Sequence, residues 1–285
     1  MSSRNRNSIL FGIDDVIETW LGINGDGKYG NGEGDPRYSS RTAALNLTEE
    51  SVDEPFPAKQ ILDGFQKRWE GGGSQGRSEQ NWRWEPQLGL GPSNQGEKEL
   101  EKLAAFLLGK SEWTNQIPVC SGLMPPPYEE GHRAIDLGRK ISDNTFEFIE
   151  LKFKLGTGNL TGDRHPLYAA LELLEYGMLY VFARANELIK QRQECDLSQA
   201  GTVHLVVLGP EAWYGEYSDF QWLANVINEG LNSLLNTEWC TPKQELVMSL
   251  CFRKLDEEFI EPYNQLQKGM ESFRSVFPVY QPAYK

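Results

Sequence analysis

The strongest constraint on the fold of this chain lies between residues 133 and 210, where two strand-like runs, a long apolar helix and an apolar strand follow one another. The runs RAIDLGRKI and TFEFIELKF are separated only by Ser142, Asp143 and Asn144, which is typical of a hairpin. Behind Pro166, the stretch HPLYAALELLEYGMLYVFARANELIKQ has helical apolar spacing. TVHLVVLGP then has the nearly continuous apolar pattern of a buried central strand. This order predicts an α/β domain.

The domain begins near Gly96 in this interpretation. GEKELEKLAAFLLGK places apolar residues on one helical stripe, and IPVCSGL, starting at Ile117, is a short strand. We therefore assign residues 96–210 to a core domain. Residues 1–95 are rich in Gly, Ser, Asn and Pro, so we expect an irregular extension whose helices are short, at Ser8 to Leu21 and at Pro57 to Trp69. Residues 211–285 are expected to form an α/β addition packed on the core, with the helix DFQWLANVINEGLNSLLN, the strand ELVMSLCFRKL and a terminal helix.

Composition indicates a soluble protein in the cytoplasm. Hydrophobic residues make up 39% of the chain, and no stretch approaches the roughly 18 apolar residues that a membrane span requires. The first residues do not resemble a secretory signal, because the apolar run Ile9 to Ile13 is short and acids follow it. The four cysteines form no CxxC pair, which argues against a structural zinc site or a disulfide framework.

The net charge of −13 opposes a nucleic-acid function at first sight, since binding a polyanion normally needs an excess of Lys and Arg. The distribution is uneven, however. Residues 131–192 contain nine Lys or Arg and eight Asp or Glu, whereas the remaining segments are acidic. The only segment that is not acidic is therefore the one with the candidate site.

The two strands of the predicted hairpin bring charged side chains together. Alternation in the second strand places Glu150 and Lys152 on one face and its apolar residues on the other. In the first strand, Asp136 is expected on the face opposite Ile135 and Leu137, and the hairpin would bring it near Glu150 and Lys152. Two carboxylates and a lysine are predicted to meet on one side of the sheet.

Such a group suits a hard cation. Carboxylate, carbonyl and water oxygens are the ligands of Mg²⁺, so Asp136, Glu150 and the carbonyl of Leu151 form a plausible partial shell. The metal would lower the pKa of a bound water and neutralise phosphate charge. Lys152 would orient or deprotonate that water and stabilise the transition state, and a nearby cation would depress the pKa of this lysine.

Asp136, the hairpin and the triplet Glu150-Leu151-Lys152, between an acidic helix and a long helix, resemble the PD-(D/E)XK or restriction-endonuclease-like nuclease superfamily. The resemblance covers residues 96–210 and implies a central mixed sheet flanked by helices, Mg²⁺ or Mn²⁺ as cofactor and DNA as substrate. Asp136 and Glu150 would be metal ligands and Lys152 the catalytic lysine. Glu101, or Glu97 one turn earlier, resembles the glutamate that many members have on the first helix.

Two further positions bear on the resemblance. Glu172 and Tyr176 have the spacing of a Gln and Tyr pair that some branches carry, with Glu replacing Gln, and Ile135 stands where the motif has Pro. The alternatives are structural: an E-x-K triplet is common on a solvated strand face, and the glutamates near residue 100 could pair with neighbouring lysines on an exposed helix.

Two functions of different class remain open. The first is a metal-dependent nuclease that hydrolyses DNA phosphodiester bonds, favoured by the presence of Asp136, Glu150 and Lys152 together. The second is a catalytically inactive nuclease-like subunit or scaffold that binds another protein through its acidic surface, favoured by the net charge and the long unmatched flanks. No membrane partner is expected, and the oligomeric state is left open.

Overall fold

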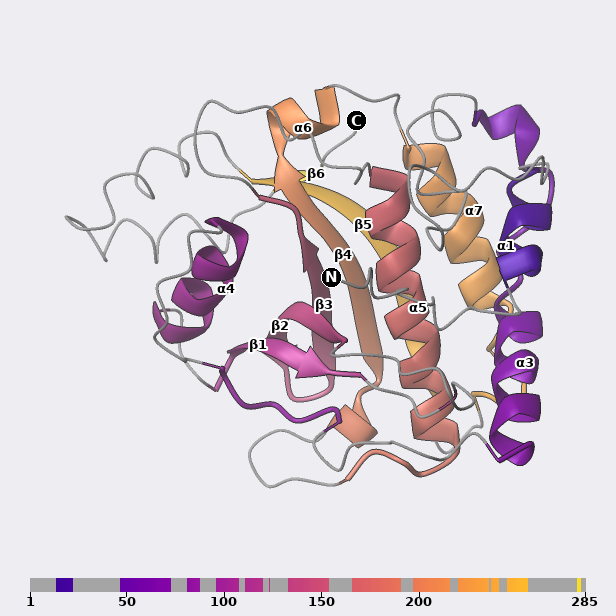
Figure 1. The fold of residues 1–285 in the computed structure, drawn as a ribbon, viewed down its shortest axis with the longest axis horizontal. Helices are drawn as coiled ribbons and strands as arrows, with labels where there is room; N and C mark the ends of the chain where they lie inside the picture. The colour runs from indigo at the N-terminus through magenta and orange to yellow at the C-terminus, as the bar shows by residue number, and fades with distance from the viewer. Residues whose placement is uncertain are drawn as a thin grey trace, which may run out of the picture.

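A computed structural model describes residues 14–22, 47–72, 81–87, 96–107, 111–119, 123, 133–153, 166–190, 197–215, 220–235, 237–240, 245–255 and 281–282. These residues form a mixed β-sheet with helices on both faces (Figure 1). The predicted α/β class is therefore confirmed.

The sheet has the strand order β1-β2-β3-β4-β5-β6. The strands are β1 (Trp113–Pro118), β2 (Ala134–Ser142), β3 (Thr145–Leu151), β4 (Thr202–Pro210), β5 (Val247–Leu255) and the two-residue β6 (Gln281–Pro282). β1, β2 and β3 are antiparallel neighbours, β3, β4 and β5 are parallel, and β6 is antiparallel to β5. The predicted hairpin is β2–β3, closed at the pair Ser142 and Thr145.

The long helix α5 (Pro166–Ala185) connects the parallel strands β3 and β4, as a parallel connection requires. Nearly all of α5 is buried, because it packs against the sheet on one side and α3 (Ala58–Glu70) on the other. Helix α7 (Gln221–Asn232) packs beside α5 against β5, and α1 (Asp14–Trp20) lies near α3 (Figure 1). Helix α4 (Gly96–Leu107) covers the opposite face near β1. The remaining short helices are η2 (Glu49–Ser51), η3 (Leu197–Gln199) and α6 (Glu211–Gly215).

Alternation along β3 divides the core into two layers. Phe146 and Phe148 belong to the large cluster on the α5 side, whereas Ile149 and Leu151 pack with Leu100 of α4 on the other side. Both faces of β3 are thus buried, and this explains why most of its residues around Glu150 are apolar.

The flanking segments contribute to the same architecture. The predicted helix at Pro57 to Trp69 is α3, and the indole of Trp82 stacks on Phe148 with ring centroids 6.3 Å apart. The predicted strand and helix after residue 211 are β5 and α7. The first predicted strand begins earlier than expected, at Trp113 instead of Ile117, because the polar Thr114 and Asn115 are buried in the ladder with β2. The predicted terminal helix lies outside the described residues, as do residues 8–13 of the first predicted helix, whose described part contains α1.

Within the described part of the chain, no helix combines the length and the apolar character needed to cross a bilayer.

Candidate active site

The candidate site lies at the carboxyl end of β3, where β2 begins and α4 approaches the sheet. Asp136 of β2 accepts a hydrogen bond at its Oδ2 from the backbone N–H of Leu151, at 2.9 Å. Glu97 of α4 accepts one at its Oε2 from the N–H of Phe153, at 3.0 Å. Asp136 therefore connects β2 to the end of β3, and Glu97 connects α4 to the same end.

Three carboxylates converge at this point. Oxygen atoms of Glu97, Glu101 and Asp136 all lie within 4.8 Å of one another. Glu101 is only 2% exposed, and the amide nitrogen of Gln116 donates to its Oε2 at 2.7 Å. Two oxygens bound to one Ca²⁺-sized or smaller cation lie within about 5 Å of each other, so small side-chain movements would let all three groups share an ion. Glu97 and Glu101 are one helical turn apart and both face Asp136, although the sequence presented them as alternatives.

Glu150 and Lys152 form a buried ion pair on the same strand end. The side chains are 4% and 5% exposed, respectively, and the Lys152 ammonium donates to Glu150 Oε1. The Lys152 Nζ also lies 3.6 Å from Glu172 Oε2 of α5. The hydroxyl of Tyr176 donates to Glu172 Oε1 at 3.4 Å. The interpretation of this E-x-K triplet as a solvated strand face is therefore wrong.

The arrangement differs from the predicted metal shell in two respects. The three clustered carboxylates are Glu97, Glu101 and Asp136, whereas Glu150 is engaged by Lys152. The group of Leu151 that contacts the cluster is its N–H, which donates to Asp136. The Oε1 atom of Glu150 would be free for a cation once the Lys152 ammonium moved away from it.

The expected placement of Asp136 opposite both Ile135 and Leu137 is wrong. Ile135 packs in the core on the α5 side, and Leu137 packs in the core on the α4 side, so alternation breaks between them. In β1, the facing residue Gln116 has φ of +52°, a left-handed conformation that is rare outside glycine. The β1–β2 ladder has no pair at Gln116 and Asp136, and at this level the Gln116 amide donates to Glu101 of α4.

Burial and like charges dominate the electrostatics. Burial raises the pKa of Glu101 to about 8, opposed by the Gln116 hydrogen bond and reinforced by Glu97. Burial also raises the pKa of Asp136 well above its usual range, with Glu101 as the next cause, and it raises the pKa of Glu150, with Asp136 as the next cause. A bound cation would strongly stabilise the ionised form of carboxyl groups in such a site.

With no cation in the structure, the pKa of Lys152 lies above its usual value, and its expected depression by a bound metal ion stays a prediction. Burial alone would lower it, but Glu150, Glu172 and Asp136 together outweigh burial and raise the pKa of this lysine above its usual value. Without a metal ion, Lys152 is therefore an ammonium that donates hydrogen bonds and does not act as a base.

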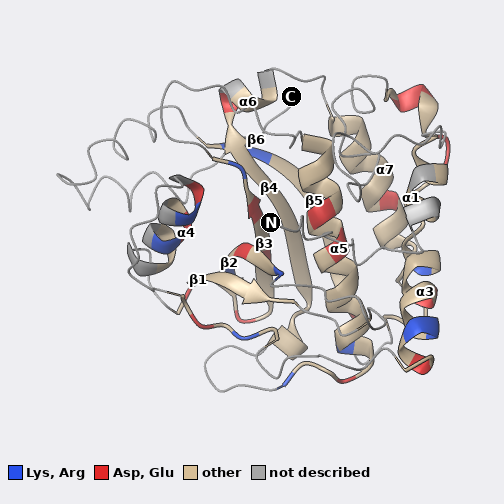
Figure 2. Ribbon diagram, viewed as in Figure 1, with Lys and Arg blue, Asp and Glu red and all other residues tan. Residues whose placement is uncertain are grey.

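Acidic side chains predominate in this site. Carboxyl groups of Glu97, Glu101, Asp136, Glu150 and Glu172 lie around the ammonium of Lys152, and burial favours the protonated form of Glu101, Asp136 and Glu150. Figure 2 shows acidic positions on α4, β3 and α5, the elements that meet here. The sequence contained the signal for each of these acids but none for Gln116, because a glutamine in a left-handed conformation has no sequence signature.

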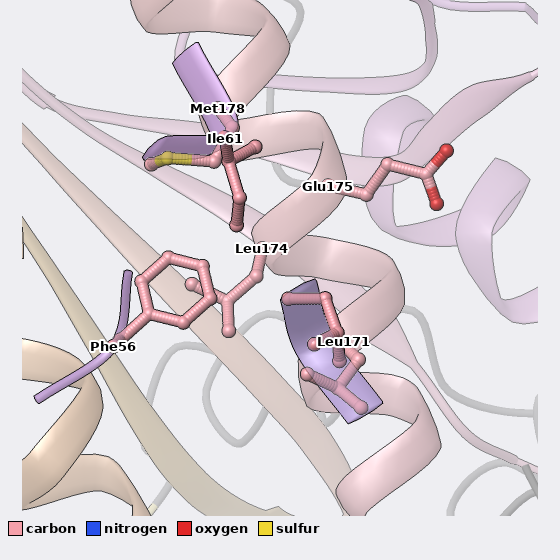
Figure 3. A pocket seen from close by; sticks show the side chains of 7 residues that line it. Phe56, Ile61, Leu171, Leu174, Glu175 and Met178 are labelled. Carbon is pink, nitrogen blue, oxygen red and sulfur yellow. The ribbon is translucent and has the colours of Figure 1, made fainter. Parts of the chain in front are cut away.

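The apolar junction of α1, α3 and α5 offers no alternative site. Its lining includes Phe56, Ile61, Leu174 and Met178, whose side chains gather around one point, and the Glu175 carboxylate is directed away from them (Figure 3). The junction leaves no room for a water-sized molecule. Glu175 instead pairs with Arg133 at 2.5 Å, which accounts for its burial.

A scan against protein-family models finds no matching family, and searches of curated proteins and of solved structures find no match. The function is therefore argued from the chemistry of the site.

Proposed function

We propose that this chain is a metal-dependent nuclease with a restriction-endonuclease-like core of the PD-(D/E)XK type. The observation that carries the proposal is the convergence at the end of β3 of a carboxylate cluster, Glu97, Glu101 and Asp136, with the buried pair Glu150 and Lys152. The hairpin followed by a crossover helix and a parallel strand supports the same core, because it places Asp136 and the E-x-K triplet on adjacent strands.

The donor set fits a hard divalent cation. All side-chain ligands are carboxylate oxygens, the type that Mg²⁺ and Mn²⁺ prefer, whereas zinc sites usually include His or Cys. Glu97, Glu101 and Asp136 would hold the ion, and Glu150 would complete the set after leaving Lys152. Three acids within 4.8 Å of one another in a largely buried position also need a cation to offset their mutual repulsion.

The chemistry supported by this arrangement is hydrolysis of a phosphodiester. A bound Mg²⁺ or Mn²⁺ supplies a water of lowered pKa and neutralises charge on the phosphate. The Lys152 ammonium donates hydrogen bonds to the phosphate oxygens as negative charge accumulates on them. The water oxygen would bond to phosphorus as the P–O bond to the leaving sugar oxygen breaks. The proton released by the attacking water would pass to solvent, and solvent would protonate the leaving oxygen. The carboxylates would fix the orientation of the reacting groups.

The test is incubation of the purified chain with linear, nicked and single-stranded DNA and with RNA, in Mg²⁺, Mn²⁺ or EDTA. We expect cleavage of DNA that requires metal and falls by several orders of magnitude in Asp136→Asn. A matched control is Asp143→Asn, which removes a fully exposed acid from the same hairpin and should leave cleavage unchanged.

The competing function is a nuclease-like scaffold that binds another protein through its acidic surface. A wild-type chain that cleaves none of these substrates and shows no metal-dependent shift in melting temperature would favour the scaffold and reject the nuclease.

A further inference from the structure

Lys152 is shared between two carboxylates from different elements. Its Nζ donates to Glu150 on its own strand and lies 3.6 Å from Glu172 Oε2 on α5. We infer that Glu172 is a positioning residue that holds the Lys152 ammonium when Glu150 turns to the metal ion. The inference rests on the proposed function and assigns a role to a residue outside the E-x-K triplet.

The need for a second carboxylate follows from burial. A cation bound by Glu150 repels the ammonium of Lys152, so the two positive charges cannot share this carboxylate without loss of attraction. An ammonium on a side chain that is only 5% exposed cannot be left without a counter-charge, because a buried unpaired charge is strongly unfavourable. Glu172 provides that counter-charge within one short side-chain movement.

Tyr176 keeps Glu172 in place. Its hydroxyl donates to Glu172 Oε1, at 3.4 Å, while Oε2 of the same carboxylate faces Lys152. The two residues are four apart on α5, so they lie on one face of the helix, and Tyr176 is only 4% exposed. The carboxylate is thus oriented by a group whose own position is fixed in the core.

The positioning role of Glu172 depends on its negative charge as well as on its capacity to accept hydrogen bonds. A glutamine at this position would present a carbonyl oxygen to Lys152 but no negative charge. The substitution Glu172→Gln is therefore the most direct perturbation, since it keeps the shape and removes only the charge. In that variant Lys152 should remain on Glu150, and Glu150 should be less available to a cation.

The experiment titrates Mg²⁺ against the full-length wild type and Glu172→Gln, with melting temperature and DNA cleavage as separate readouts. We expect the Mg²⁺ concentration at half-maximal thermal shift to rise about tenfold in the variant, the size of effect typical of residues that orient metal-site groups. At saturating Mg²⁺, kcat should fall about tenfold or more while the KM for DNA changes little. Glu172→Asp should restore part of both losses.

The control is Glu187→Gln, which removes one charge from an exposed position just beyond α5 and should match the wild type in both readouts. A Glu172→Gln protein with the wild-type Mg²⁺ midpoint and kcat would overturn the inference and leave the proposed nuclease intact. A Glu172→Gln protein whose melting temperature in EDTA falls, but whose Mg²⁺ midpoint and kcat do not change, would also overturn the inference, because it would indicate a purely structural role. A wild type without metal-dependent melting or cleavage would reject the nuclease, and the role of Glu172 with it.

Discussion

Replacing Glu101 by Gln should stabilise the metal-free protein at alkaline pH. Glu101 is 2% exposed, and burial together with Glu97 raises its pKa from 4.5 to about 8. Between these two values the folded state binds a proton that the unfolded state has lost, so the stability decreases as pH rises. The loss of unfolding free energy caused by the Glu101 charge is absent below about pH 4.5, grows between pH 4.5 and about 8, and reaches its full size above about pH 8.

The size of the effect follows from the same pKa difference. A carboxyl group whose pKa rises from 4.5 to about 8 on folding lowers the free energy of unfolding at high pH by at most about 5 kcal/mol. Since Glu97 and Asp136 compete for the same proton, we expect about 2 kcal/mol from removing the Glu101 charge alone. For a chain of this size, that corresponds to an increase of about 4–8 °C in melting temperature.

The assay is thermal unfolding in EDTA at pH 5, 7 and 8.5, followed by circular dichroism. Glu101→Gln should melt above the wild type at pH 8.5, and the difference should shrink toward pH 5, where Glu101 is protonated in the folded wild type. Glu112→Gln, which neutralises an exposed acid, serves as the control and should show no such trend. Equal melting temperatures for Glu101→Gln and the wild type at pH 8.5 would refute the account of a crowded, desolvated carboxylate cluster.

Three further perturbations test the site and the fold. Mg²⁺ or Mn²⁺ should raise the melting temperature of the wild type, and the rise should shrink in Asp136→Asn because a ligand is lost. Lys152→Ala should abolish cleavage and lower the free energy of unfolding by about 3 kcal/mol in EDTA at neutral pH, measured by urea titration, because Glu150 loses its buried partner. Gly230→Ala should lower the free energy of unfolding by about 3 kcal/mol or more in the same titration, because the added Cβ would lie 2.1 Å from the backbone oxygen of Phe56. A urea midpoint equal to that of the wild type would contradict the packing of α7 against Phe56.

The order of elements around the site could be predicted from the sequence because local patterns determine it. The β2–β3 hairpin follows from two strand-like runs around a polar turn, and α5 follows from a long apolar stripe behind Pro166. The approach of Glu101 to Asp136 was expected from the resemblance to the nuclease superfamily, many members of which carry a glutamate on the helix before the first strand.

The details of the site depend on features that no local pattern contains. The alternation of β2 breaks at Asp136, at the level where the neighbouring strand adopts a left-handed conformation at Gln116, and neither residue type indicates this. The partner of Glu150 depends on the balance between burial and charge: among the described residues, the cation that contacts the Glu150 carboxylate is Lys152, and the two residues pair. Alternation indicated that Glu150 and Lys152 share a face, but not that they form an ion pair, and the metal role of Glu150 stays a prediction.

The most direct test of the central claim is the rate of DNA cleavage by wild-type and Asp136→Asn protein, purified in parallel and assayed in Mg²⁺ and in EDTA. Asp136 lies in the carboxylate cluster with Glu97 and Glu101 of α4 and also accepts a hydrogen bond from the N–H of Leu151 at the end of β3. The account predicts cleavage by the wild type in Mg²⁺ alone, and a rate at least about a thousandfold lower in the variant, since a metal ligand acts chiefly in the transition state. Equal rates in the two proteins, or wild-type cleavage that persists in EDTA, would contradict it.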